Sequence, residues 1–158
     1  MERPNWIEYF MINAQLIATR STCPRLSVGA VITKNNEIIA TGYNGAVKGE
    51  DHCIDHGCLI QDGHCVRTIH AEMNAIMQCA KNNTSLFGGR IYVTHFPCIN
   101  CLKSIIQCGI KEIYYLNDYN NNEYAEYLIQ SQNIKIKKVD LTHNKQINKI
   151  SNILDGKD

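Results

Sequence analysis

The order of apolar and polar residues along the chain predicts one α/β domain. Apolar residues three and four positions apart favour a first helix from about Asn5 to Arg20, which would pack one face on a sheet. The apolar runs 28–33 and 37–42 are separated by the short polar turn Lys34-Asn35-Asn36 and predict a β-hairpin. The residues expected on the packed face of the first helix are Trp6, Tyr9, Phe10, Asn13, Leu16 and Ile17.

Helical and strand patterns alternate in the second half of the chain. The pattern predicts helices over 70–81, 98–108 and 123–132, and strands over 90–94, 112–116 and 134–139. A hairpin followed by alternating helices and strands indicates a three-layer α/β/α sandwich on a mixed five-stranded sheet, with the later strands parallel. We expect residues 1–139 to form this domain, and residues 140–158 to form a polar and partly disordered C-terminal tail.

Composition and charge narrow the class of protein. The 158 residues, 44% of them apolar, suit a single domain with its own core. A net charge of +1 provides no broad cationic surface, so we expect a small-molecule substrate and no nucleic-acid polymer as partner. The sequence has no export signal and no apolar run approaching the roughly 18 residues of a membrane span, which favours a cytoplasmic protein without membrane contact.

Two short motifs combine the ligands of a zinc site with a carboxylate. His70-Ala71-Glu72 and Pro97-Cys98-Ile99-Asn100-Cys101 supply three nitrogen and sulfur ligands, His70, Cys98 and Cys101. Three ligands leave a fourth position for a water, whose pKa the metal lowers to roughly 7. The order H-x-E…P-C-x-x-C is the signature of zinc-dependent nucleobase deaminases.

Helix geometry restricts where these residues can lie. Residues two apart point about 200° away from each other on a helix, so His70 and Glu72 can serve one site only from its first turn. Cys98 and Cys101 are three apart and share a face, and Pro97 suits a helix start. We expect Glu72 to accept a proton from the attacking water, to pass it to ring nitrogen N3 of a cytosine, and to help protonate the leaving ammonia.

Other interpretations of the motifs stay open. Cys-x-x-Cys alone also occurs in redox pairs and as half of a structural zinc site. A zinc-stabilised binding module would make every cysteine structural, although it would leave Glu72 without a role and would lack a basic face. Among enzymes, the nearest alternative is a zinc deaminase that acts on a tRNA base, guanine, a free nucleoside or dCTP.

Over about residues 5–139 the chain resembles the deoxycytidylate (dCMP) deaminases of the cytidine deaminase superfamily, of bacterial and phage type. The segments that carry the resemblance are 21–23, 28–32, 41–45, 63–72 and 93–98. The resemblance implies a homohexamer that converts dCMP to dUMP, with activation by dCTP and inhibition by dTTP, and with Mg²⁺ accompanying the effector. It also implies that His70, Cys98 and Cys101 bind catalytic zinc and that Glu72 is the proton shuttle.

The resemblance supplies further candidate residues. Asn44 matches the family asparagine that holds the sugar 3′-hydroxyl, although Asn-Gly is also a common turn sequence. Phe96 is a candidate wall of the base pocket, and Arg25, Lys81 and Tyr119 are weaker candidates for phosphate or substrate contact. The residues that resemble the family's allosteric nucleotide loop are Gly42, Tyr43, Asn44, Gly45, Lys48 and Gly49, and here Ala46-Val47-Lys48-Gly49 departs from the usual pattern, which contains a proline.

A second metal site is predicted from the remaining cysteines. Eight cysteines in a reducing compartment favour thiolate metal ligands over disulfides, and residues 45–68 lack the periodicity of a core element. Some members of the family carry a second zinc, and Cys23 and Cys53 match two of its ligand positions. The candidate ligands of this structural zinc are Cys23, Cys53, Cys58 and Cys65, with His52, His56 and His64 as substitutes and free buried thiols as the alternative.

Overall fold

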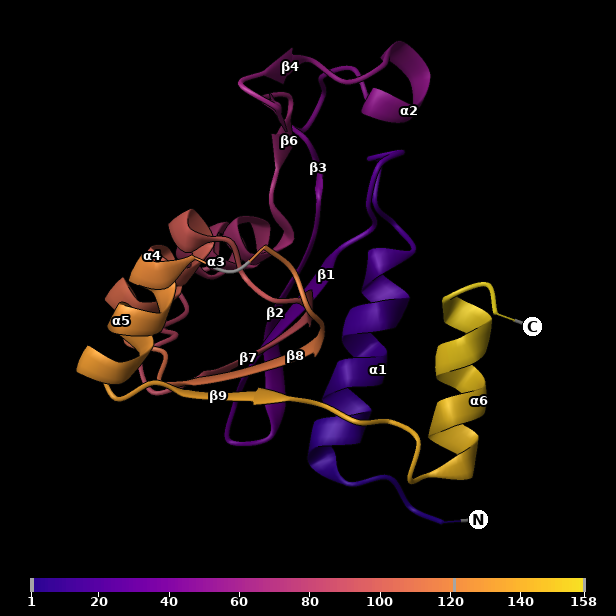
Figure 1. Ribbon diagram of the computed structural model, residues 1–158, viewed down its shortest axis with the longest axis vertical. Coiled ribbons are helices and arrows are strands. Elements are labelled where there is room, and N and C mark those ends of the chain that lie inside the picture. Colours follow the sequence, from indigo (N-terminus) through magenta and orange to yellow (C-terminus); the bar gives the residue numbers. More distant parts are fainter. Residues whose placement is uncertain (1, 121, 158) are drawn as a thin grey trace.

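The computed structural model describes residues 2–120 and 122–157. Figure 1 shows a central sheet between two helical layers, with a small projection beyond one end of the sheet. The predicted α/β/α sandwich on a mixed five-stranded sheet is therefore confirmed. Within the described ranges, no helix is both long and apolar enough to cross a membrane.

The sheet has the strand order β2-β1-β7-β8-β9. Strand β1 is antiparallel to β2 and β7, whereas β7, β8 and β9 are mutually parallel. The strands are β1 (Gly29–Lys34), β2 (Glu37–Tyr43), β7 (Arg90–His95), β8 (Glu112–Asn117) and β9 (Lys135–Lys138). The helices are α1 (Trp6–Ala18), α2 (Cys53–His56), α3 (Ala71–Lys81), α4 (Ile99–Gln107), α5 (Glu123–Ser131) and α6 (Lys145–Leu154).

The predicted hairpin closes through two residues in the left-handed backbone region. Asn35 and Asn36 have φ of 54° and 59°, which is the conformation of a type I′ turn. Asparagine tolerates positive φ better than most residues, so the polar turn in the sequence also selects the turn type.

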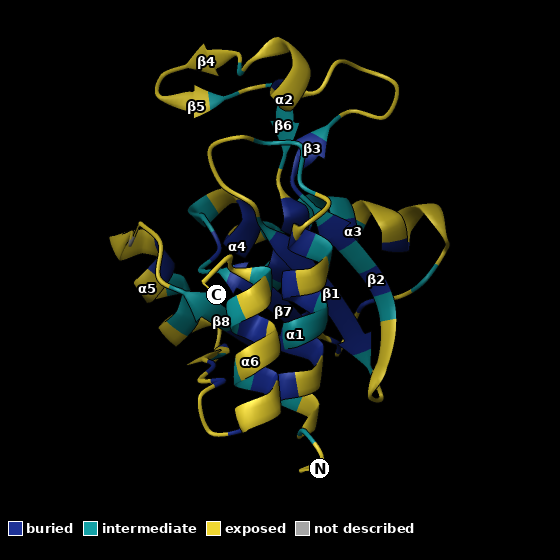
Figure 2. Ribbon diagram, turned by 90° about the vertical axis from the view of Figure 1, so that its right-hand side faces the viewer, coloured by how far each residue is buried: buried dark blue, intermediate teal, exposed yellow. Residues whose placement is uncertain are grey.

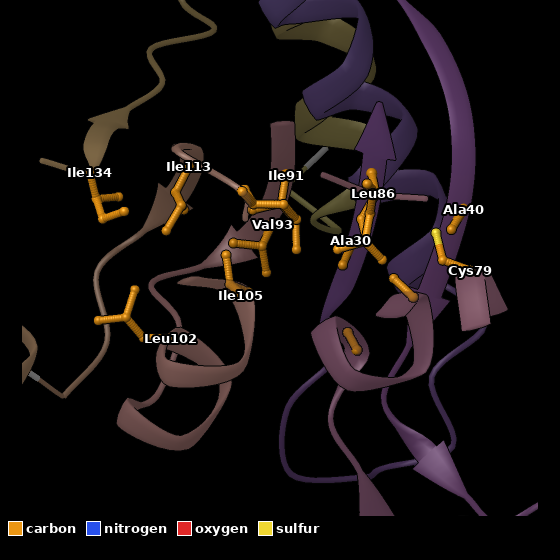
Figure 3. Packing of buried hydrophobic residues seen from close by; sticks show 14 of the residues in the cluster. Ala30, Ala40, Cys79, Leu86, Ile91, Val93, Leu102, Ile105, Ile113 and Ile134 are labelled. Carbon is orange, nitrogen blue, oxygen red and sulfur yellow. The ribbon is translucent and has the colours of Figure 1, made fainter. Parts of the chain in front are cut away.

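Each face of the sheet buries its own cluster of apolar side chains. In β7, Ile91 and Val93 point to the face covered by α3, α4 and α5, and Tyr92 points to the face covered by α1, as strand alternation requires. Figure 3 shows Ile91 and Val93 packed between the neighbouring strands and Ile105 of α4. Because these side chains are fully buried, the C-terminal end of β7 has a fixed position relative to α4.

The predicted face of α1 is partly wrong, since Phe10 and Ile17 pack against the sheet but three other residues of the set do not. Trp6, Tyr9 and Leu16 are 48%, 44% and 55% exposed, and the buried stripe contains Phe10, Met11, Ala14 and Ala18. The reason is a close approach between helix and strand, since an ideal β-carbon on Gly29 would lie 2.0 Å from the Ala14 carbonyl oxygen. Where Gly29 meets α1, the helix therefore carries the small residues Ala14 and Ala18. The larger buried residues Phe10 and Met11 lie beside this contact, in the apolar cluster on the same face of the sheet.

The C-terminal segment contains a helix that the polar composition did not predict. Helix α6 lies alongside α1 (Figures 1 and 2), and Leu141 and Ile147 are buried against the α1 side of the sheet. Asn144 caps its start by accepting hydrogen bonds from the backbone N–H of Gln146 and Ile147. The structure thus places packed secondary structure where a partly disordered tail was expected.

The stretch without periodicity forms the projection seen in Figures 1 and 2. It contains α2 and the short strands β4 (Ile60–Gln61) and β5 (His64–Cys65). Two further short strands, β3 (Gly45–Ala46) and β6 (Thr68–Ile69), pair with each other and connect the projection to the body. Between residues 46 and 69 only Cys53 is buried, so an apolar core does not hold this segment together.

Candidate active site

The residues of the two motifs meet at the starts of two helices. His70 is the N-cap of α3, with extended backbone angles, and Glu72 lies in the first turn of that helix. Cys98 is the N-cap of α4, and Cys101 lies in its first turn. Both helices therefore direct the positive ends of their dipoles at the same place, which favours thiolates there.

The spacing of these side chains fits a tetrahedral metal site. The sulfur atoms of Cys98 and Cys101 lie 3.5 Å and 3.4 Å from Nδ1 of His70. Zinc bonds of about 2.3 Å to sulfur and 2.05 Å to nitrogen, at tetrahedral angles, place the two ligand atoms about 3.6 Å apart. The three ligand atoms lie within 4.8 Å of one another, so the residues present fit a zinc ion.

The electrostatics of the cluster favour metal binding. Hydrogen bonds from the Cys101 thiol and from His70 lower the pKa of Cys98 to about 4. The hydrogen bond to Cys98 and burial raise the pKa of the Cys101 thiol. A metal ion bound here would displace the remaining ligand protons, because thiolate and neutral imidazole are the metal-binding forms.

Glu72 lies beside the ligand cluster and is almost fully buried. Its side chain is 4% exposed, and burial raises the pKa of its carboxyl group to about 7. The carboxyl group also hydrogen-bonds Cys101, which places it next to the metal ligands. A carboxyl group in such an environment can both accept and release a proton near neutral pH.

Close packing against β2 fixes the start of α3. An ideal β-carbon on Gly42 would lie 2.1 Å from the carbonyl oxygen of Ala71, the residue between His70 and Glu72. One turn later, Asn74 donates a hydrogen bond of 2.8 Å to the carbonyl oxygen of Tyr43. Asn74 was not among the residues predicted from the sequence, because a polar residue on a helix carries no signal of its partner.

Asn44 holds a loop beside the site in this structure. Its Oδ1 accepts a 2.8 Å hydrogen bond from the Val28 backbone N–H, and its Nδ2 donates a 2.7 Å bond to the Leu26 carbonyl oxygen. The residue is 6% exposed. Asn44 therefore fixes residues 26–28, and its contact with a sugar hydroxyl stays a prediction.

The other candidate substrate residues differ in their positions. Phe96 directly precedes the ligand segment, packs edge-on against Tyr115 at 5.1 Å, and lines a cavity of about 450 Å³ together with Tyr119. Arg25 is exposed on the loop that Asn44 holds. Lys81 lies at the far end of α3, about 16 Å along the axis from His70 at 1.5 Å per residue. The structure thus does not bring Lys81 to the site.

Three of the remaining cysteines form a second cluster in the projection. Cys53, Cys58 and Cys65 have sulfur atoms within 4.8 Å of one another, and the Cys53 and Cys65 sulfurs are 3.7 Å apart. Two thiolates on tetrahedral zinc are separated by about 3.8 Å. Cys23 and the three histidines named as substitutes are not in this cluster. Cys23 follows Thr22, however, and the Thr22 carbonyl oxygen accepts a 3.1 Å hydrogen bond from the Ile54 N–H of α2.

Hydrogen bonds prepare Cys65 to act as a thiolate. Although burial opposes ionisation, the Thr68 hydroxyl and the backbone N–H groups of Arg67 and Leu59 lower the pKa of Cys65 to about 6. Backbone N–H groups directed at sulfur stabilise the negative charge that a metal ligand carries.

Comparisons with known proteins agree with this geometry. Residues 4–117 match the family model described as the cytidine and deoxycytidylate deaminase zinc-binding region. ComE operon protein 2 of Bacillus subtilis (strain 168) is 55% identical over 89% of this chain and 75% of its own length. The deoxycytidylate deaminase of Schizosaccharomyces pombe is 34% identical over 85% of this chain, which spans only 44% of that protein.

A solved structure also has the same fold. The dCMP deaminase from cyanophage S-TIM5, in complex with dCMP and dUMP, superimposes with a TM-score of 0.76 and 34% identity, covering 88% of this chain and 100% of that one. The family match covers more than half of the chain and includes all three ligands and Glu72. The chain therefore belongs to the cytidine and deoxycytidylate deaminase family and is a deaminase.

Proposed function

We propose that the chain catalyses the zinc-dependent hydrolysis of dCMP to dUMP and ammonia. The observation that carries the proposal is the three-ligand cluster with a buried carboxyl group beside it, since a structural site would use a fourth protein ligand. The choice of dCMP is supported by relatives named deoxycytidylate deaminase in fission yeast, phage T4 and humans, and by the cyanophage enzyme solved with dCMP and dUMP.

The chain's own residues have separate roles in this reaction. His70, Cys98 and Cys101 would hold zinc, which supplies a Lewis acid that lowers the pKa of a water molecule to roughly 7. The Glu72 carboxylate takes a proton from the attacking water and delivers it to N3 of the cytosine ring. The water oxygen bonds to C4 of the ring, and Glu72 then takes the second proton from this oxygen and gives it to the amino group. The C4–N bond breaks and ammonia leaves, so water and dCMP balance against dUMP and ammonia.

Substrate contacts are assigned to residues around the ligand cluster. Phe96 would wall the base pocket, because it is adjacent in sequence to the segment that carries Cys98 and is half-buried. Asn44, Arg25 and Tyr119 are the other proposed contacts, with Arg25 as a cation for the phosphate. Lys81 is left out of this set because of its distance along α3.

A second, structural zinc is proposed in the projection. Cys53, Cys58 and Cys65 supply three ligands at spacings that suit zinc, in a segment with almost no apolar core. Cys23 is the proposed fourth ligand, because the neighbouring Thr22 is hydrogen-bonded to α2. Such an ion would stabilise β6, which leads directly into His70.

Regulation and assembly rest on the family resemblance. We expect a cytoplasmic homohexamer that dCTP, with Mg²⁺, activates and dTTP inhibits. The proposed effector loop contains Gly42, Tyr43, Asn44, Gly45, Lys48 and Gly49. Strand β3 in this loop pairs with β6, with Gly45 opposite Ile69, so an effector bound there would act one residue away from His70.

A comparison of substrates tests the proposed function. Ammonia release is measured from dCMP, CMP, deoxycytidine and dCTP at equal concentrations, with and without dCTP or dTTP as effectors. We expect the highest kcat/KM for dCMP. Equal values for deoxycytidine and dCMP would contradict the assignment of a nucleotide substrate.

A further inference from the structure

The ligand Cys98 has less support from packing than Cys101. Cys101 lies in the first turn of α4 and is 2% exposed, whereas Cys98 precedes the helix as its N-cap and is half-buried. Phe96 and Pro97 connect the end of β7 to Cys98. A ligand outside a helix takes its position from the segment before it, so the contacts of this connection decide where the Cys98 sulfur lies.

Asn117, at the end of β8, holds this connection through two hydrogen bonds. Its side-chain Nδ2 donates a 2.9 Å bond to the Thr94 carbonyl oxygen, and its backbone carbonyl oxygen accepts a 2.9 Å bond from the Phe96 N–H. The pairing of β7 with β8 ends at the same place, with His95 opposite Asn117. Asn117 thus binds the residue before and the residue after His95, where regular sheet pairing stops.

Thr94 is fixed on the other side of β7 as well. Its Oγ1 accepts a 3.1 Å hydrogen bond from the Gly29 N–H of β1, and the residue is 3% exposed. The Thr94 carbonyl oxygen is therefore a fixed support, and the Asn117 amide joins the end of β8 to it.

A short and stiff link carries this position to Cys98. The ring of Pro97 fixes its own φ at about −65° and restricts the preceding Phe96 to extended backbone angles. Because Pro97 has no N–H, the Phe96 N–H is the last backbone donor before the ligand. The Phe96 ring also packs edge-on against Tyr115 of β8, with 5.1 Å between the ring centroids. A displacement at Asn117 is therefore passed on to Cys98.

We propose that Asn117 is a positioning residue for Cys98, and that donation from its side-chain amide to the Thr94 carbonyl oxygen keeps the Cys98 thiolate where metal binding requires it. This inference rests on the zinc site of the proposed function. Asn117 acts on Cys98 through Phe96 and Pro97 and is not itself a ligand. Groups behind the ligands that orient them commonly contribute roughly 10- to 100-fold to metal affinity.

The surroundings of Asn117 leave room for substitution. The residue is half-buried and lines a cavity of about 270 Å³, together with Thr94, His95 and Asp155. Side chains of similar or smaller size fit at this position, so we expect such variants to fold. His95 and Asp155 are the titratable groups that line the cavity.

Metal affinity, measured by competition with a chelator for zinc and for cobalt(II), tests the inference in two variants. Asn117→Ala removes the donor. Asn117→Asp replaces it with a carboxyl group of nearly the same shape, which donates only when it is protonated. We expect Asn117→Ala to weaken the affinity for both metals by about 10-fold at every pH. The thiolate-to-cobalt charge-transfer absorption should also change in both variants, because it depends on the position of the Cys98 sulfur.

Asn117→Asp should differ from Asn117→Ala in its pH dependence. The Thr94 carbonyl oxygen and the Asp155 carboxylate should raise the pKa of the introduced carboxyl group above its usual value of about 3.9. At pH 8 the ionised group repels the Thr94 oxygen, so the loss of affinity should exceed that of Asn117→Ala. At pH 5 the protonated group donates again, so the loss should become smaller than that of Asn117→Ala. Each affinity is divided by that of the unaltered protein at the same pH, which removes the titration of His95 and of the ligands.

Asn13→Asp is the matched control. The Asn13 side-chain amide also donates to a backbone carbonyl oxygen, that of Tyr9 at 2.7 Å, but on the exposed side of α1. Loss of this bond should leave metal affinity and cobalt absorption unchanged at both pH values. Urea unfolding of the metal-free proteins shows whether each variant keeps the fold.

Each outcome decides one question. Unchanged metal affinity and unchanged cobalt absorption in both Asn117 variants would overturn the inference. A loss in Asn117→Asp that is the same at pH 5 and pH 8 would also overturn it, since donation to Thr94 would then be irrelevant. Loss of the fold in both variants would overturn it too, because the amide would then support the whole domain. Absence of ammonia release from dCMP in the unaltered, zinc-loaded protein would instead contradict the proposed function, and the metal measurements would still decide the role of Asn117.

Discussion

Gly42 of β2 lies so close to Ala71 of α3 that a β-carbon at position 42 would come within 2.1 Å of the Ala71 carbonyl oxygen. This contact sets the distance between the sheet and the first turn of α3, which carries His70 and Glu72. The site geometry therefore depends on a residue that has no functional group.

Gly42→Ala is expected to displace the start of α3. Because the clash is with backbone atoms, the helix must shift, and we expect a loss of about 1–3 kcal/mol in the free energy of unfolding together with weaker zinc binding. Urea unfolding and zinc titration measure both effects. Gly88→Ala is the control, since Gly88 has φ of 74° and no atom near the added carbon, so it should cost about 1 kcal/mol and leave zinc affinity unchanged.

Cys58→Ser is expected to remove the proposed structural zinc. The cluster would keep only Cys53 and Cys65, and the projection has almost no core to replace the lost ligand. Elemental analysis should change from two zinc ions per chain to one, and limited proteolysis should cut between residues 47 and 67. A zinc content of one ion in the unaltered protein, with no change in Cys58→Ser, would rule out the second site. The control is Cys108→Ser, at a cysteine outside both clusters.

Glu112 is expected to make stability depend on pH in the acid range. Although partial burial favours the neutral form, the Tyr114 hydroxyl at 2.8 Å and the Arg90 guanidinium at 3.0 Å lower the pKa of Glu112. A carboxyl group whose folded-state pKa is depressed stabilises the fold above its unfolded pKa of about 4.3, and this contribution disappears as the pH falls through the folded pKa.

Glu112→Gln should therefore lower the free energy of unfolding at pH 7 by up to about 1 kcal/mol, because the group is partly exposed. The difference from the unaltered protein should shrink between pH 5 and pH 3 in urea titrations, by the linkage of protonation to folding. A constant difference across that range would contradict the assignment. Glu37→Gln, at an exposed position of β2, should have little effect at any pH.

Ile147→Ala tests whether the C-terminal segment is part of the folded domain. Ile147 is 6% exposed in the cluster shared with α1, so truncation should cost about 2–4 kcal/mol of unfolding free energy. Ile150 lies on the same helix and is 42% exposed, so Ile150→Ala should lower the free energy of unfolding by less than about 1 kcal/mol. Equal small losses for both variants in urea unfolding would show that α6 does not pack on the domain in solution.

Local patterns predicted most of the fold. The hairpin and the strand–helix alternation followed from periodicity and turn residues, which act over a few neighbouring positions. The face of α1 and the existence of α6 did not follow, because both depend on distant partners. Ala14 is buried since it meets Gly29 of β1, and Ile147 is buried since α6 finds a place beside α1.

The ligand motif was predictable for the same reason. Cys98 and Cys101 share a helix turn, and His70 and Glu72 fit one site only at a helix start, so spacing alone constrains them. The Asn74 bond to Tyr43 required coordinates, since it depends on how α3 lies against β2. The distance of Lys81 from His70 follows from the length of the helix alone. The pairing of Gln15 with Asp155, 140 residues apart, has no signal in the sequence.

We expect Glu72 to carry protons in a site whose metal is held by three other residues. Glu72→Gln keeps the size of the side chain and removes its ability to take a proton. Zinc content and ammonia release from dCMP are measured on the same preparation, beside the unaltered protein and Glu37→Gln. We expect unchanged zinc content and a decrease in kcat of about 10²- to 10⁴-fold in Glu72→Gln only. Zinc-loaded Glu72→Gln with kcat within a few-fold of the unaltered protein would contradict it.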